Sequence, residues 1–414
     1  APPPGGAASR VAVLAGRGKV RYRIQRFDDA AADLRAARAL AEVEGDLSAV
    51  AELLLEEATV LDWSDDYAGS QALVDRAAPL VARIGDAAQR ARCDVAVGRG
   101  HFRRQELEQA IARLAPAARD AGALGDHEGC VIALLLLAPA LVYAGRLDEA
   151  EARFHEVVAR CERVGDRLHL GIALMNRLTL RLMREDPEGA QGDLRAAVAL
   201  ARELGNAYLE RGPAHNLAEL LYWSGELAEA LPLAVRAFEL QRRFFQATPV
   251  PDYALLVARI HAARGELAEA ARHLDWALGQ CDLGAAPPVT RVLFRLCALL
   301  AQGGGGKGGG RDAGGGDAGG GEAVGRDAGG RDDEAWEALI AEARSASLLS
   351  ELIEILCFAA ADALKRGRRE EARRWLGEAA QTSFGQRFWR GRLAHLAARL
   401  ERLERLERLD DDPA

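Results

Sequence analysis

The sequence predicts an all-α protein, a solenoid of about nine helical hairpins. Its 414 residues are too many for one compact core, so they form either several domains or a repeat array. Ala and Leu supply most of the hydrophobic residues while aromatic residues reach only 5%, a bias that favours helix over sheet. One residue pattern recurs seven times at a constant period of 40 residues, which indicates a repeat array.

The second helix of each hairpin is predicted from a column of small residues. The column consists of Ala30, Ser70, Ala110, Ala150, Ala190, Ala230 and Ala270. A larger apolar residue stands four positions later in most repeats and another small residue seven positions later, as at Phe154 and Val157. The spacing i, i+4, i+7 places all three on one helix face, where small residues let a neighbouring helix approach closely.

The turns are predicted from glycine and from residues that cap helices. Gly145, Gly225 and Gly265 stand in the short turn within a hairpin. Between hairpins the sequence reads Gly-Asp or Gly-Asn, first at Gly45-Asp46. Glycine adopts the left-handed conformation that ends one helix, and Asp caps the N-terminus of the next.

This pattern resembles the tetratricopeptide repeat, a helix–turn–helix unit, most clearly at Gly145, Leu147, Ala150, Phe154 and Val157. The resemblance implies a right-handed α-α superhelix. The longer period and the Gly-Asp pairs are similar to repeats of large bacterial signalling proteins, in which the array follows an ATPase or protein-kinase domain. That narrower resemblance implies a regulatory role.

The pattern also predicts the boundaries of the segments. Residues 303–331 are dominated by glycine and are expected to be a disordered insertion between the helices of the eighth hairpin, whose first helix is expected at 288–302. The full division is a linker at 1–8, a solenoid at 9–302, the insertion at 303–331, the continued solenoid at 332–386, and a capping helix with its tail at 387–414.

Composition argues against several classes of partner and site. The net charge is −8 and Lys and Arg are dispersed, so no nucleic-acid partner is expected. The longest apolar run, Val131 to Tyr143, is too short to span a bilayer, so we expect no membrane segment. The start of the chain lacks the pattern of a secretory signal, and the cytoplasm is the expected location. The Pro/Gly-rich start resembles an interdomain linker, which suggests a piece of a longer protein.

The sequence offers no convincing catalytic, metal or cofactor site. The six cysteines are far apart and not at metal-ligand spacing, so they are interpreted as reduced thiols. Gly306-Lys307 suggests a phosphate loop, but Ala301 and Gly308 occupy positions that such a loop needs as Gly and Ser or Thr. His155 and Cys161 lack a third, orienting group. We therefore expect a protein that is not an enzyme and binds no cofactor.

A candidate groove follows from aromatic and basic residues near the ends of the first helices. They could simply wedge adjacent hairpins together, since large aromatic residues are usually buried. They could also line a concave groove for a partner segment, since aromatic residues and Arg are enriched at protein interfaces. The set is Tyr22, Arg23, Trp63, Arg99, Phe102, Arg103, Tyr143, His215, Tyr222, Trp223 and Arg259.

Two functional hypotheses remain at this point. The preferred one is a protein-interaction scaffold that binds a protein or peptide segment in this groove. The alternative is the sensor or regulatory region of a larger signalling ATPase, protein kinase or transcriptional regulator, with the chemistry on another part of that protein. The sequence that precedes Ala1 in the gene would distinguish them.

Overall fold

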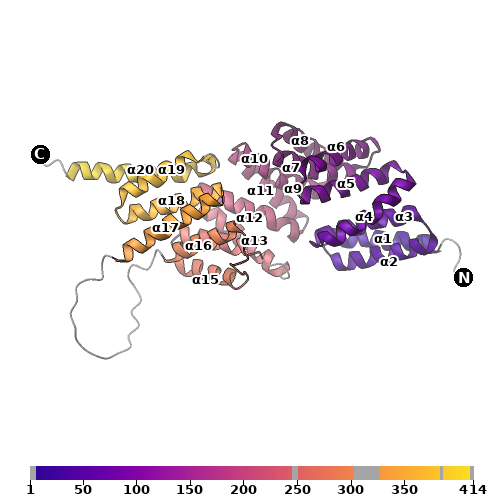
Figure 1. Ribbon diagram of the computed structural model, residues 1–414, viewed down its shortest axis with the longest axis horizontal. Coiled ribbons are helices and arrows are strands. Elements are labelled where there is room, and N and C mark those ends of the chain that lie inside the picture. The colour runs from indigo at the N-terminus through magenta and orange to yellow at the C-terminus, as the bar shows by residue number, and fades with distance from the viewer. Residues whose placement is uncertain (1–5, 245–249, 303–326, 383–385, 411–414) are drawn as a thin grey trace, which may run out of the picture. The chain divides into compact units, whose positions relative to one another are not determined.

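The computed structural model describes residues 6–244, 250–302, 327–382 and 386–410, and in these ranges it contains helices and no strand (Figure 1). The first four hairpins pair α1 with α2, α3 with α4, α5 with α6 and α7 with α8. Their bounds are α1 Gly6–Arg23, α2 Phe27–Glu44, α3 Leu47–Trp63, α4 Tyr67–Ile84, α5 Ala87–Arg103, α6 Leu107–Ala123, α7 His127–Tyr143 and α8 Leu147–Val164.

In the fifth hairpin the first helix is interrupted at Arg177, and four further hairpins and a final helix follow. The fifth hairpin has α9 Arg167–Asn176, α10 Leu178–Met183 and α11 Pro187–Glu203. The others are α12 Ala207–Ser224, α13 Leu227–Phe244, α14 Asp252–Ala263, α15 Leu267–Leu278, α16 Pro288–Gln302, α17 Asp327–Ser345, α18 Leu349–Lys365 and α19 Arg369–Gln381, before α20 Gln386–Asp410. The described part of the chain thus has the nine predicted hairpins.

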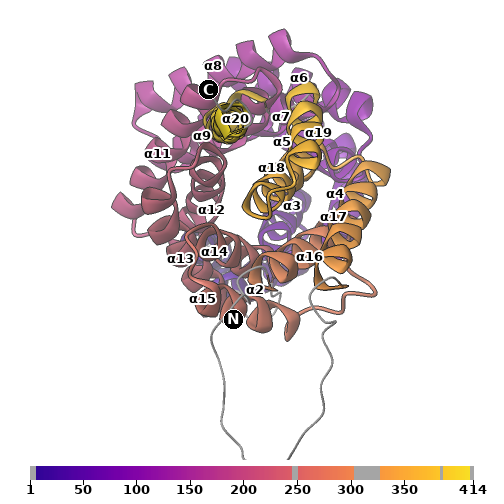
Figure 2. The ribbon, with the colours of Figure 1, turned by 90° about the vertical axis from the view of Figure 1, so that its left-hand side faces the viewer.

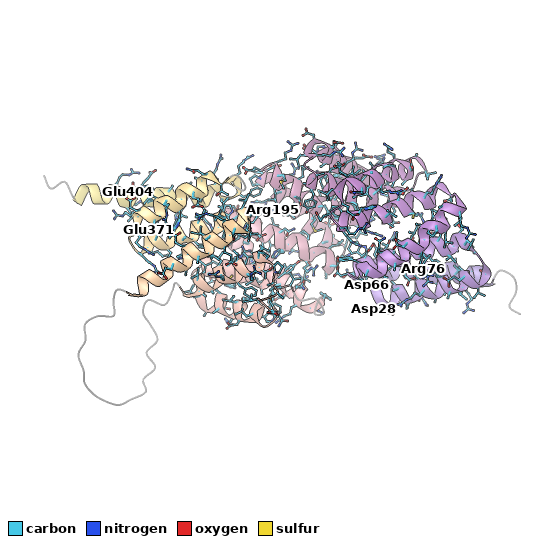
Figure 3. All side chains as sticks on the ribbon, viewed as in Figure 1. Asp28, Asp66, Arg76, Arg195, Glu371 and Glu404 are labelled. Carbon is cyan, nitrogen blue, oxygen red and sulfur yellow. The ribbon has the colours of Figure 1, made fainter. Side chains whose placement is uncertain are left out.

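The chain forms two compact units. Unit 1 consists of residues 1–180 and 199–208, and unit 2 of residues 181–198 and 209–414. Acidic and basic side chains follow the helices of both units, as the labelled Asp28, Arg76, Arg195 and Glu371 show (Figure 3). This agrees with the predicted dispersal of charge.

The predicted columns pack as expected. Ala30, Ala110, Ala150 and Ala230 are completely buried, each on a different second helix. Phe154, one turn after Ala150 on α8, is completely buried too. A side chain larger than Ala at these positions would push two helices apart, because protein interiors are close-packed. The small-residue column therefore sets the distance between neighbouring helices.

The predicted caps are present too. Gly45 has φ 73° at the end of α2, and the Asp46 side chain accepts a hydrogen bond from the backbone N–H of Ala49 at the start of α3. Within hairpins, some turns use residues other than glycine: Gln105 has φ 60° and Asp65 has φ 63°. These left-handed residues cost about 1 kcal/mol each relative to an unstrained backbone.

Neighbouring first helices are joined by hydrogen bonds between residues about one repeat apart. Arg92 donates to Glu52 at 3.1 Å, and Arg259 donates to Glu219 at 2.8 Å, each pair being separated by 40 residues. The Gln89 amide donates to the Ser48 hydroxyl at 2.8 Å across 41 residues. These contacts fix the register of one hairpin on the next.

The apolar run at Val131–Tyr143 lies in α7, whose buried residues form part of the core of unit 1. No helix in the described ranges combines the length and the hydropathy needed to cross a bilayer. In unit 2, α17 begins at Asp327, inside the range predicted as a glycine-rich insertion. The rest of that predicted insertion, 303–326, and most of the predicted linker, 1–5, lie outside the described residues.

Candidate functional site

The candidate site is a cavity on the first-helix face of unit 1, with a volume of about 140 Å³. It lies among α1, α3, α5 and α7, the first helices of four successive hairpins. Residues of these helices and of the α7 N-cap line it: Lys19, Tyr22, Arg23, Glu52, Leu55, Glu56, Thr59, Gln89, Arg92, Val95, Ala96, Arg99, Asp126, Glu128, Gly129 and Ile132. Three of the predicted groove residues, Tyr22, Arg23 and Arg99, are among them.

The charges of the cavity wall are balanced, and most of them are paired with one another. Four basic and four acidic side chains line the cavity. Lys19 lies 2.8 Å from Glu56, and Arg92 lies 3.1 Å from Glu52 and 3.3 Å from Asp126. A wall without net charge does not select a free anion or cation, so it suits a ligand that is neutral overall.

An ion pair closes one side of the cavity. Arg23, at the end of α1, lies 3.0 Å from Glu128, at the start of α7, although 105 residues separate them. Both side chains are about half exposed, at 54% and 49%. An exposed pair of this kind contributes at most about 1 kcal/mol, so this side of the cavity can open at little cost.

A buried acceptor lines the same cavity. Gln89 is 8% exposed, and its Nε2 donates to the hydroxyl and the backbone carbonyl of Ser48. These two bonds fix the orientation of the amide and leave Oε1 on the other side. Within the described residues this oxygen has no hydrogen-bond partner. Buried polar atoms are nearly always paired, so this oxygen is an acceptor left unused by the residues that surround it.

The predicted aromatic residues of unit 1 form two pairs, and only Tyr22 of the four lines the cavity. Tyr22 lies near Trp63 with ring centroids 6.0 Å apart, and Phe102 lies near Tyr143 at 6.1 Å. Burial raises the pKa of the Tyr22 phenol to about 12, so the phenol stays neutral. Tyr143 is half exposed and open to a ligand, whereas Tyr22 and Phe102 are partly covered by their neighbours.

Arg99 and Arg103 are held in place by a residue that the sequence did not single out. Asp62 on α3 is buried and pairs with both, at 2.6 Å from Arg99. Arg103 also stacks on the ring of Tyr67, 4.1 Å from its centroid. Burial lowers the pKa of Arg99, and Asp62 opposes this effect. These two arginines are therefore mainly structural, although Arg99 still contributes to the cavity wall.

In unit 2 three predicted groove residues are not open to a partner. Tyr222, Arg259 and Trp223 are 0%, 2% and 8% exposed. Tyr222 donates to Glu354 at 2.7 Å, and Arg259 donates to the other oxygen of Glu354 at 2.6 Å. Of the two interpretations of the sequence, burial between helices fits these three: α18, which carries Glu354, packs on Tyr222 and Arg259, and α20 packs on Trp223.

The last predicted residue, His215, is partly buried beside Tyr253, with ring centroids 4.4 Å apart. Burial lowers the pKa of His215 from its ordinary value near 6.5 to about 4. The positive charges of Arg259 and Arg211 act in the same direction, while Glu219 opposes them. The imidazole is therefore neutral at physiological pH.

The buried cysteine thiols are poorly suited to catalysis. Cys161 is fully buried, and burial raises its pKa to about 12, so its thiol is a poor nucleophile. Cys297 and Cys357 are buried with a pKa raised to about 12 for the same reason. Among the residues that the structure describes, no group of three or more His, Cys, Asp or Glu side chains is placed to hold a metal ion.

Comparison with solved structures identifies the fold. The chain matches a Rap protein complexed with competence and sporulation factor, with a TM-score of 0.57 and 14% identity, over 94% of this chain and 99% of that one. It matches the apo form of the quorum sensor NprR from B. thuringiensis with a TM-score of 0.55 and 13% identity, over 88% and 98%.

The fold is that of tetratricopeptide-type helical repeat proteins. A third match is a signal-transduction ATPase with a tetratricopeptide repeat sensor from Pyrococcus horikoshii, with a TM-score of 0.54 and 14% identity, over 70% of this chain and 43% of that one. No family model matches the sequence, and no curated protein matches it significantly. The predicted resemblance to this repeat class is confirmed at the level of the fold.

Proposed function

We propose that unit 1 is a receptor for an extended peptide segment of a partner protein, bound in the cavity among α1, α3, α5 and α7. The observation that carries this proposal is the cavity across four successive first helices, whose lining residue Gln89 has an Oε1 with no partner among the described residues. A peptide in extended conformation offers backbone N–H groups that helices and sheets use internally. One of these groups would satisfy the Gln89 oxygen.

The other features of the cavity fit the same ligand. Its volume of about 140 Å³ is enough for one anchoring side chain, with the rest of the segment lying along the helices outside it. Leu55, Val95 and Ile132 provide an apolar surface for one aliphatic side chain. The paired charges of the wall can exchange partners with the charged side chains of a peptide and add specificity more than affinity.

Two similar structures support the proposal by analogy. One was solved with competence and sporulation factor bound, and the other is a quorum sensor. Both are whole-length matches, so the comparison covers the solenoid and not only a fragment of it. The identity is low, and the analogy supports a recognition role without specifying the peptide.

The experiment is selection from a phage-displayed library of random heptapeptides on the purified chain. Thr59→Trp fills the cavity and should abolish enrichment, whereas Ala82→Trp, at an exposed position on α4, should leave it unchanged. Circular dichroism checks that both variants are folded. If the library yields no peptide, or if Thr59→Trp binds the selected peptides normally, the proposed function is wrong.

Backbone N-methylation of a selected peptide then tests the role of Gln89. Methylating one particular amide should weaken binding to the wild type by about tenfold, the loss of one hydrogen bond to a buried partner. The same methylation should have no further effect on binding to Gln89→Leu. Equal effects in both proteins would show that the peptide does not use the Gln89 oxygen.

A second candidate is the sensor region of a larger signalling ATPase. The match to the Pyrococcus horikoshii protein favours it, since that protein carries a tetratricopeptide repeat sensor and this chain corresponds to 43% of its length. The two candidates are compatible, because a peptide receptor can serve as a sensor. Sequencing the gene upstream of Ala1 distinguishes a receptor that acts alone from one attached to an ATPase.

A further inference from the structure

We propose that the first-helix face of unit 2 is a separate, helix-binding surface whose resident occupant is α20, and that a partner helix with the same pattern of anchors can replace α20. This surface consists of Tyr222, Trp223 and Ser224 at the end of α12 and Phe358 on α18. It is independent of the cavity in unit 1. The sequence suggested only a polar cap for α20, but the structure places the start of this helix against α12, 170 residues earlier in the chain.

The first anchors of α20 are two aromatic side chains. Phe388 and Trp389 are buried, and both pack on the Trp223 ring, with centroids 6.0 and 6.2 Å away. Two residues later Gly391 approaches the backbone oxygen of Ser224, which a Cβ atom at this position would meet at 3.4 Å. The surface therefore receives an aromatic pair, and the backbone of α20 comes close to that of α12 just after it.

The next anchor is a cation held among aromatic rings. The Arg392 guanidinium lies 4.9 Å from the centroid of Tyr222, 5.2 Å from that of Phe358 and 5.2 Å from that of Trp389. It also donates to the Tyr222 backbone oxygen at 2.8 Å. Cations over several aromatic faces are a recurrent mode of recognition. The pattern of anchors that the surface contacts is thus Phe-Trp-x-x-Arg, on a helix.

The fit of α20 to this surface is incomplete. The Trp223 Nε1 is buried and has no hydrogen-bond acceptor among the described residues. A permanent core contact normally satisfies such a donor, because leaving it unpaired costs free energy. A partner helix that adds a carboxylate or amide oxygen beside its aromatic pair would satisfy it, and would bind more tightly than α20 does.

The contacts of α20 become sparser after Leu400. Leu396 and Leu400 are buried, whereas Glu401, Arg402 and Arg405 are exposed. Beyond Leu400 the helix is still held through Glu404, which pairs with Arg373 of α19, and it is joined covalently to unit 2 (Figure 2, where α20 is seen end-on in yellow). A tethered occupant has an effective concentration in the millimolar range, so a free helix competes only when the tethered one is weakened or the free one fits better.

The test uses a fluorescein-labelled synthetic peptide of residues 386–402 and the full-length chain. In the variant Trp389→Ala/Arg392→Ala the resident helix loses two anchors, and the probe should bind at least tenfold more tightly than it binds the wild type. Trp389→Ala/Arg390→Ala keeps Arg392 and changes an exposed arginine instead, so it should gain less. A probe peptide that carries the Trp389→Ala change should bind none of the proteins.

Hydrogen exchange on the unmodified protein gives a second, independent readout. Backbone amides of residues 388–400 should exchange faster than those of α18, because α20 detaches without unfolding the surface beneath it. Equal protection of α20 and α18, or equal binding of the probe to the wild type and to the Trp389→Ala/Arg392→Ala variant, overturns the proposal. Either result would make α20 a fixed part of the core.

Discussion

Replacing Arg259 in unit 2 by Met should destabilise the protein severely, because the buried carboxylate of Glu354 then has no positive partner. Arg259 and Glu354 are 2% and 1% exposed and lie 2.6 Å apart. Without Arg259, Glu354 keeps one neutral donor, the Tyr222 hydroxyl at 2.7 Å. Removing one partner of such a pair costs about 3–5 kcal/mol. Glu219 also loses its arginine, but its side chain is 27% exposed and adds less than about 1 kcal/mol.

The double variant Arg259→Met/Glu354→Met separates the cost of the stranded charge from the loss of packing. It removes both charges and leaves only the Tyr222 hydroxyl without its acceptor, a loss of about 1–2 kcal/mol. The double variant should therefore be about 2–3 kcal/mol more stable than the single one. Urea unfolding, followed by tryptophan fluorescence and by circular dichroism, measures this difference. If the double variant is no more stable than Arg259→Met, the unpaired charge of Glu354 is not what destabilises the single variant.

Three further predictions concern packing, turn conformation and pH. Ala150→Trp should lower the free energy of unfolding by about 3 kcal/mol or more, because it overpacks a fully buried column. Ala152→Trp, at an exposed position on the same helix, should lower it by less than about 0.5 kcal/mol, and urea unfolding measures both. Gln105→Gly should stabilise by about 0.5 kcal/mol, since it relieves a left-handed residue at φ 60°, and Gln105→Ala should not; thermal unfolding checks both. His215 takes up a proton below about pH 6.5 in the unfolded chain but only below about pH 4 in the folded protein. As the pH falls from 6.5 to 4, the free energy of unfolding should therefore decrease by up to about 3 kcal/mol. His215→Gln should lack this contribution when the two proteins are unfolded at each pH.

The repeat pattern predicted most of the local structure. The small-residue column at Ala30 and Ala150 and the caps at Gly45 and Asp46 depend on neighbours within one hairpin, and these neighbours recur every 40 residues. The helix 288–302 was predicted with its observed ends because Pro288 marks its start. Such local rules do not need the path of the whole solenoid.

The parts of the site that could not be predicted depend on contacts between distant repeats. The curvature of a solenoid accumulates from small rotations between successive repeats, and one sequence does not reveal these rotations. The curvature brings Glu128 to Arg23, and Glu354 to Tyr222. It also decides whether an aromatic residue lines a cavity, as Tyr22 does, or lies beneath another helix, as Tyr222 does. One weak signal was present, since Arg and acidic residues 40 positions apart, such as Glu219 and Arg259, suggest pairing between adjacent first helices.

The ion pair between Arg23 and Glu128 makes the number of repeats a functional quantity. It joins the first helix of the first hairpin to that of the fourth, so the cavity between them spans a fixed number of hairpins. Gain or loss of a single 40-residue unit between α2 and α7 would preserve every cap and every packing column while moving these two side chains out of reach. Unequal recombination within such a gene would thus yield stable proteins with altered recognition, and selection for the ligand would act on the count of repeats as well as on single residues.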